Sequence, residues 1–210
     1  EDSAIDGVTP IAVLARDLVR ARYHIFISHN QAEASGDVGT LFSLFEEMGV
    51  HGWRDMNQPD LTTEGVRQGV YDSDVVIIFL TNSYLSRPFC VAEVTYALEF
   101  KKPIIIVTEE EDRFWPFDLK RWQHDRCIRV SGGGPYGDGW VDGHSGKTSY
   151  KDCPQTVKDL IEERANDGSM LPFRRRDFEV NALTREIVSN ALTREIDRAS
   201  KLGLSCGVTW

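Results

Sequence analysis

The chain has 210 residues, enough for one well-buried domain with an extension and too few for two full domains. An apolar content of 41% with 10% aromatic residues excludes a disordered or fibrous protein. Acidic residues outnumber basic ones by 33 to 24, and the basic cluster at residues 174–176 has no interleaved aromatics, so we expect no nucleic-acid partner.

The N-terminal half predicts two units, each made of a strand, a loop and a helix. Residues 23–28 (YHIFIS) predict a strand covered on both faces, followed by a polar loop at residues 29–39 and a helix at residues 41–48. Residues 50–53 predict a shorter strand, and residues 55–60 a polar loop. Thr62 or Thr63 then offers an N-cap, with Glu64 in the first turn, for a helix that continues to Ser73.

The clearest buried strand is VVIIFL at residues 75–80, followed by a helix at residues 89–100 and a further strand at residues 104–107. Strands that alternate with helices at this spacing imply right-handed crossovers and a parallel sheet. A fifth candidate strand lies at residues 127–130. The glycine-rich stretch at residues 132–146 predicts a surface loop, and residues 154–164 predict an amphipathic helix.

The last segment contains a local duplication. NALTREI begins at Asn181 and again at Asn190, and this offset of nine residues places the two copies on opposite sides of a continuous helix. Such a helix is either buried on two faces or broken near Ser189.

Candidate ligand-binding residues follow from the predicted sheet. Ligands of an open α/β sheet bind beyond the carboxyl ends of the strands. The residues at those ends include Ser28, His29, Trp53, Asp55, Thr81, Asn82, Thr108 and Glu109. The helix after the third strand also places Phe89 and Glu93 one turn apart on a shared face, where an aromatic ring lies beside a negative charge.

Most of these candidates also have an interpretation without a ligand. From spacing alone, Phe89 and Glu93 are better explained as a half-buried aromatic beside a solvated glutamate, a frequent pair on helices. His29 is a loop residue with a local hydrogen bond, Asp55 a helix cap or turn residue, and Trp53 a core residue in these alternatives.

Several other sites are not expected. The four cysteines show no metal-ligand spacing, so we predict no metal site. Residues 143–148 (GHSGKT) resemble the tail of a P-loop, but Val141 replaces its first glycine. No segment reaches the roughly 18 apolar residues that a membrane span requires, and we expect a cytoplasmic protein.

An ordered set of motifs resembles the TIR domain family over residues 23–107, with the helix at residues 154–164 as its last element. The set comprises a strand ending in I-S-H, W-R-D at residues 53–55, the strand VVIIFLT, S-Y-L-S at residues 83–86 and F-C-V-A-E at residues 89–93. The family usually reads S-x-W-C-x-x-E-L in the last segment, so Phe89 stands in place of Trp and Val94 in place of Leu. Pro59 and Asp60 occupy a loop that usually carries a glycine, so the sequence departs from the family in the loop linked to assembly or gating.

The resemblance implies a flavodoxin-like three-layer α/β sandwich with a central parallel five-stranded sheet and a helical C-terminal extension. The corresponding division is an N-terminal flank at residues 1–22, a TIR domain at residues 23–168 and the extension at residues 169–210.

The resemblance also implies a signalling NAD+ glycohydrolase, activated by self-association, with Glu93 as its catalytic carboxylate. NAD+ is then a substrate and no cofactor is needed, and the products are nicotinamide and either ADP-ribose or a cyclic isomer. Phe89, Ser28, His29, Trp53, Asp55 and Thr81 are the expected substrate contacts. The alternatives are a non-enzymatic adaptor that acts through homotypic TIR assembly and a nucleoside-processing transferase with the same topology.

Overall fold

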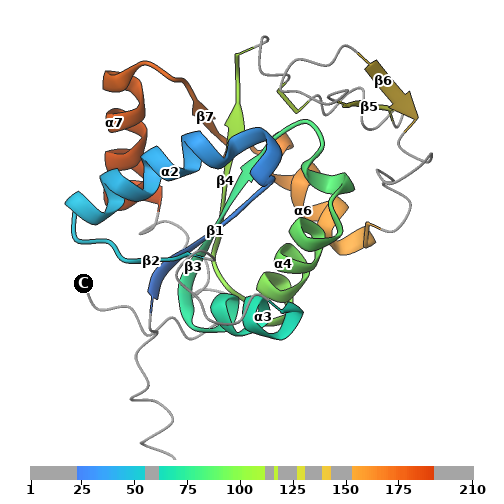
Figure 1. The fold of residues 1–210 in the computed structure, drawn as a ribbon, viewed down its shortest axis with the longest axis horizontal. Helices are drawn as coiled ribbons and strands as arrows, with labels where there is room; N and C mark the ends of the chain where they lie inside the picture. The colour runs from blue at the N-terminus through green and yellow to red at the C-terminus, as the bar shows by residue number, and fades with distance from the viewer. Residues whose placement is uncertain are drawn as a thin grey trace, which may run out of the picture.

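A computed structural model describes residues 23–54, 62–111, 116–117, 127–130, 139–142 and 153–191. The predicted flank at residues 1–22, the loop that holds Asp55 and the P-loop-like residues 143–148 lie outside these ranges. In the described part, two layers of helices cover the two faces of a parallel sheet (Figure 1). The expected three-layer α/β fold is confirmed.

The central sheet has five strands in the order β2-β1-β3-β4-β7, and all neighbouring pairs are parallel. The strands are β1 (Tyr23–His29), β2 (Gly52–Trp53), β3 (Ser73–Leu80), β4 (Ile104–Glu109) and β7 (Leu171–Phe173). The chain moves outward from β1 to β2 and then returns to place β3 on the other side of β1. The carboxyl end of β1 is therefore the topological switch point of the sheet, where α/β folds form ligand crevices.

Helices α2 (Gln31–Glu47) and α7 (Asp177–Glu186) cover one face of the sheet (Figure 1). The loop predicted at residues 29–39 is wrong, because α2 begins at Gln31 after Asn30, whose side chain accepts a hydrogen bond from the Ala32 N–H at 3.2 Å. Its buried positions keep helical spacing from the first turns onward, at Ala34, Val38, Leu41, Phe42 and Phe45.

Helices α3 (Thr63–Tyr71), α4 (Pro88–Glu99) and α6 (Gln155–Asn166) cover the other face. The predicted cap of α3 is confirmed, since the Thr62 hydroxyl accepts from the Gly65 N–H at 3.3 Å. Pro88 occupies the first turn of α4, where its missing N–H has no helical partner to lose. A short 3₁₀ turn, η2 (Tyr84–Ser86), links β3 to α4.

The strands alternate between the two helix layers, as the period of a strand requires. In β1, Ile25 and Ile27 pack toward α2 and α7, whereas Phe26 packs toward α3 and α4. Because Ser28 lies two residues after Phe26, its side chain also points to the α4 side. This alternation brings a polar side chain of β1 to the start of α4.

The predicted fifth strand is corrected by the structure. Residues 127–130 do form a strand, β5 (Cys127–Val130), but it pairs antiparallel with β6 (Gly139–Asp142) in a separate two-stranded sheet. Strand β6 lies in the glycine-rich stretch for which the sequence predicts a loop throughout. The fifth strand of the main sheet is β7, which lies beside β4 with Leu171 opposite Val107.

The segment predicted as a C-terminal extension contributes directly to the core. Besides β7, helix α7 buries Val180 and Leu183, and the following Ile187 is also buried. The first NALTREI copy ends in a π-helical turn (Ile187–Ala191), and most of the second copy lies outside the described residues.

No helix of the described residues has both the length and the apolar character needed to cross a membrane. The same residues contain no group of three or more His, Cys, Asp or Glu side chains arranged to hold a metal ion.

Candidate functional site

A pocket of about 530 Å³ opens at the switch point, beyond the carboxyl end of β1. The starts of α2 and α4 and the end of β2 form its walls. Glu93 is the only carboxylate among the described residues that line it. The pocket therefore combines one negative group with walls that are mostly apolar, the usual composition of a small-molecule site.

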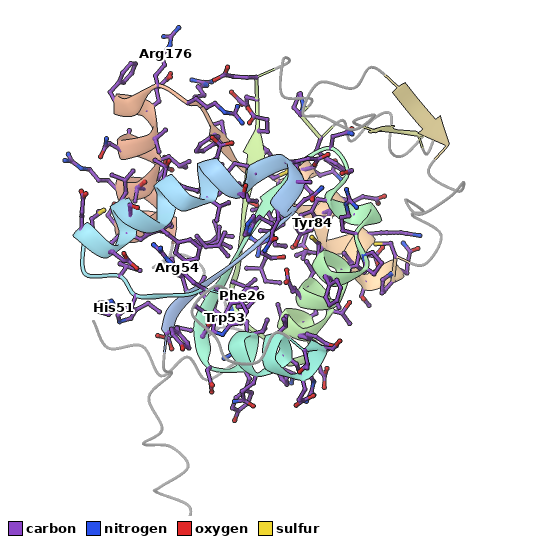
Figure 2. All side chains as sticks on the ribbon, in the orientation of Figure 1. Phe26, His51, Trp53, Arg54, Tyr84 and Arg176 are labelled. Atoms are coloured by element: carbon purple, nitrogen blue, oxygen red, sulfur yellow. The ribbon has the colours of Figure 1, made fainter. Side chains whose placement is uncertain are left out.

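Aromatic rings form the inner wall of the pocket. The Trp53 ring stacks on Phe26 with ring centroids 4.8 Å apart and an interplanar angle of 22°. Figure 2 labels both rings, which belong to the neighbouring strands β1 and β2. Trp53 also packs on the α3 backbone at Gly69, where an added Cβ would lie 2.5 Å from the indole ring. Trp53 is only 7% exposed, so it is both a core residue and a pocket wall.

Two arginines also line the pocket. Arg54, which is labelled in Figure 2, stacks over the Phe42 ring at 4.5 Å and forms an ion pair with Glu46 at 3.2 Å. Arg87 lines the pocket immediately before α4. The first turns of both α2 and α4 also line it, and the positive end of each helix dipole favours an anion.

Glu93 is half-buried and is tied to two hydroxyl groups behind it. The Ser28 hydroxyl donates a hydrogen bond to Glu93 Oε2, and the Tyr84 hydroxyl is hydrogen-bonded to Ser28 Oγ. Ser28 and Tyr84 are both 0% exposed. Burial raises the pKa of Tyr84 well above its usual value, and the nearby Cys90 and Glu93 raise it further.

Cys90 lies beside Glu93 but is not a candidate nucleophile. Burial, and then the charge of Glu93, raises the pKa of its thiol far above the usual value. Its Sγ donates to the His29 carbonyl oxygen at 3.4 Å. The thiol therefore stays protonated, whereas a nucleophilic cysteine acts as a thiolate.

A polar cluster fixes the start of α2 to the turn after β3. Asn30 Nδ2 donates to Ser83 Oγ at 2.8 Å, and Ser83 Oγ donates to Glu33 Oε1 at 2.6 Å. The Ser83 N–H also donates to Glu33 Oε2 at 3.2 Å. These bonds hold one wall of the pocket at a set distance from Tyr84, the residue that follows Ser83.

A sequence model of the TIR domain matches residues 25–139, which is more than half of the chain. The chain belongs to the TIR domain family. The matched region contains the switch point and all of the pocket residues named above.

Two solved structures illustrate the likeness to other TIR domains. The TIR domains in the activated Roq1 resistosome that directly recognises the pathogen effector XopQ share 14% identity, with a TM-score of 0.41 over 87% of this chain and 99% of that one. The TIR domain of the Toll-related receptor TRR-2 from the lower metazoan Hydra magnipapillata shares 13% identity, with a TM-score of 0.39 over 70% of this chain and 97% of that one. No similar protein was found in a comparison with curated proteins.

Four of the predicted site residues of this TIR domain line the same pocket: Glu93, Phe89, His29 and Trp53. Ser28 lies behind the pocket and contacts Glu93. Thr81 is 3% exposed, forms an isolated β-bridge with Pro116 and is not among the described lining residues. Asp55 lies outside the described residues.

Sequence reasoning missed three residues that shape the site of the TIR domain. Arg54 lies between the two nominated residues of its strand end, so the rule that selects Trp53 also points to it. Arg87 directly precedes a helix that the sequence predicts correctly. Tyr84 belongs to the S-Y-L-S motif, but no local signal shows that its hydroxyl reaches Ser28.

Proposed function

We propose that this TIR domain is an NAD+ glycohydrolase and that Glu93 is its catalytic carboxylate. The observation that carries the proposal is the position of Glu93: a hydrogen-bonded carboxylate in a pocket at the switch point, among aromatic rings and arginines. A carboxylate held in this way supplies a fixed negative charge to a reaction that develops positive charge.

The composition of the pocket suits a dinucleotide. Phe89 and Trp53 offer flat surfaces on which a base can stack, and Phe89 is 61% exposed. Arg54 and Arg87, together with the first turns of α2 and α4, suit the negative charge of a pyrophosphate. NAD+ is a substrate in this proposal, and no cofactor is required.

The reaction needs little more than one carboxylate. The bond between the ribose C1′ and the nicotinamide nitrogen breaks, and its electron pair leaves with nicotinamide as a neutral base, so no general acid is needed. The ribose passes through an oxocarbenium-like state that the Glu93 carboxylate stabilises. Water then adds to C1′ and loses a proton to give ADP-ribose; attack by an atom of the substrate itself gives a cyclic isomer.

Self-association and cytoplasmic location belong to the same proposal, as expected from membership of the TIR family. We expect cleavage to rise with protein concentration more steeply than in direct proportion, because assembled domains are the active form.

The test is nicotinamide release from NAD+ by concentrated protein, with Glu93→Gln alongside. Glu93→Gln keeps the size of the side chain and removes its charge, so we expect release to fall by at least about 100-fold. Glu99→Gln is the matched control on the same helix, because Glu99 pairs with Arg67 at 2.7 Å and does not line the pocket. It is expected to retain activity.

Equal release by wild type and Glu93→Gln would remove Glu93 from the chemistry. No release by the wild type under assembling conditions would contradict the enzyme and leave the homotypic scaffold as the better explanation. Exchange of ribose onto a free base, with no hydrolysis, would instead identify a transferase.

A further inference from the structure

We propose that Tyr84 and Ser28 form a buried hydroxyl relay that positions Glu93 and keeps it ionised. The relay joins three elements, since Tyr84 lies in η2, Ser28 in β1 and Glu93 in α4. Its role in catalysis rests on the proposed function, whereas its effect on the titration of the Glu93 carboxyl can be measured without any reaction.

The protons of the relay have one consistent arrangement. A serine hydroxyl carries one proton, and Ser28 uses it to donate to Glu93 Oε2. The contact between Ser28 Oγ and the Tyr84 hydroxyl therefore needs the Tyr84 proton. Donation by Tyr84 to the Cys90 carbonyl oxygen, at 3.4 Å, would leave two oxygens in contact without a proton between them. Both donors consequently point toward the carboxylate.

Burial keeps this direction fixed. Ser28 and Tyr84 are fully enclosed, so water does not replace either donor. Figure 2 shows Tyr84 beside α4, the helix that carries Glu93. Burial raises the pKa of Tyr84, so the phenol keeps its proton across the working pH range. The relay favours the ionised form of Glu93, because a hydrogen bond to a carboxylate stabilises its charged state.

This arrangement changes the role of Ser28. The strand-end rule placed it among the substrate contacts, but its hydroxyl is buried and bonded to two protein groups. Ser28 and Tyr84 are therefore positioning residues that act through Glu93. Their removal is expected to change the carboxylate and to leave the pocket wall, and hence substrate affinity, largely unchanged.

Other charged and titratable groups also face Glu93 or its surroundings, and they come from several elements around the pocket. They are His29 at the end of β1, Glu33 on α2, Arg54 after β2, Arg87 and Cys90 at the start of α4, and Cys153 near Tyr84. A comparison between the wild type and a single hydroxyl deletion keeps all of these groups constant.

The first experiment is a pH titration of the Glu93 carboxyl carbon by NMR, in protein labelled at glutamate side-chain carboxyls. The resonance is assigned by its loss in Glu93→Gln. We expect the titration midpoint to rise by roughly one pH unit in Ser28→Ala and by less in Tyr84→Phe. Tyr96→Phe is the matched control on α4 and is expected to leave the midpoint unchanged. An unchanged midpoint in both relay variants, with melting temperatures near that of the wild type, would overturn the relay.

The second experiment measures nicotinamide release as a function of pH. We expect Tyr84→Phe, which removes one oxygen, to lower kcat about tenfold at neutral pH, to move the acid limb to higher pH and to change KM less than twofold. A raised KM with an unchanged kcat would show that the hydroxyls contact substrate and would overturn the positioning role. If the wild type releases no nicotinamide, the proposed function fails, and the NMR titration still decides the relay.

Discussion

At the scale of single residues, two side chains that lie one turn apart at the start of α4 have different environments. Phe89 is 61% exposed, whereas Glu93, four residues later, is half-buried and accepts a hydrogen bond from Ser28. Single exposed aromatics are common on protein surfaces and need no explanation. Phe89 differs from them because it lines the same pocket as Glu93, so its ring is available to a ligand without any cost to the core.

Phe89→Ala is therefore expected to raise KM for NAD+ by about tenfold, because the stacking surface for a base is lost. The free energy of unfolding is expected to change by less than about 0.5 kcal/mol, since the ring is largely exposed. Steady-state nicotinamide release and urea denaturation check the two parts. Phe178→Ala is the matched control: Phe178 is 67% exposed on α7 and does not line the pocket. Equal KM values for all three proteins would exclude a contact between Phe89 and the substrate.

The candidate site was predictable where it follows from the ends of strands or from residue spacing along a helix. The rule that ligands bind beyond the carboxyl ends of strands selected His29 and Trp53, and helical spacing paired Phe89 with Glu93. The same rule selected Ser28 but not its contact with Glu93, because that contact depends on how α4 packs against β1. The contact between Ser28 and Tyr84 joins residues 56 positions apart and has no local signature.

At the scale of elements, the wall of the pocket depends on a close approach between α3 and β2. Gly69 lies on the face of α3 against Trp53, and a Cβ there would be 2.5 Å from the indole Cε2 and Nε1 atoms. The indole has little room to move, because it is 7% exposed and stacked on Phe26. Glycine is thus required here by the space available and not by a special backbone conformation.

Gly69→Ala is expected to lower the free energy of unfolding by about 1–3 kcal/mol, because the added methyl group overpacks the indole. Gly36→Ala is the matched control within a helix: apart from its chain neighbours and the backbone of its own helix, no atom lies within 4 Å of the place that its new Cβ would occupy, and alanine is the better helix former by about 0.5–1 kcal/mol. Urea denaturation of both variants checks the prediction. Stabilisation by both substitutions would show that the Trp53 side chain can move to accommodate the added methyl group and that the pocket wall is not tightly packed.

The elements were predicted well where burial produces a recognisable run of apolar residues in the sequence. Strand β3 contains an unbroken apolar run from Val75 to Leu80 because both of its faces are covered, and β4 contains a similar run from Ile104 to Val107. The first turns of α2 were missed because their exposed positions are polar and include glycines, although Ala34 and Val38 already keep helical spacing. Strand β7 was missed because it is three residues long and contains Pro172, a residue that a sheet tolerates at its edge.

At the scale of the whole molecule, the C-terminal segment is fastened to the rest of the domain through Arg175. This side chain forms ion pairs with Asp37 on α2 at 2.7 Å and with Glu109 at the end of β4 at 2.5 Å. Arg175 is 17% exposed and Glu109 1% exposed, so the second pair is largely removed from water. Strand β7 and helix α7 are thereby connected to two elements that precede them by more than sixty residues.

Arg175→Ala is expected to lower the free energy of unfolding by about 3 kcal/mol, because it leaves the buried Glu109 carboxylate without its cation. Arg174→Ala is the matched control from the adjacent position. Arg174 is 54% exposed and pairs with Glu110 at 2.9 Å, and an exposed pair of this kind contributes little stability because water and salt screen it. Urea denaturation at neutral pH compares the free energies of unfolding of the two variants. Equal losses would show that the buried pair stabilises the fold no more than the exposed pair.

The pH dependence of the Arg175→Ala deficit tests the cause. Burial raises the pKa of Glu109 above its usual value, although the Glu111 N–H and Arg175 oppose the rise. The folded protein therefore holds the Glu109 proton more tightly than the unfolded chain, and ionisation of Glu109 lowers the free energy of unfolding as the pH rises through this range. Loss of Arg175 raises the pKa further, so the stability gap between wild type and Arg175→Ala should narrow as the pH falls and Glu109 becomes protonated. Adding Glu109→Gln to Arg175→Ala should recover part of the lost free energy of unfolding at neutral pH. If the stability gap is instead constant with pH and unaffected by Glu109→Gln, the lost stability comes from the packing of Arg175.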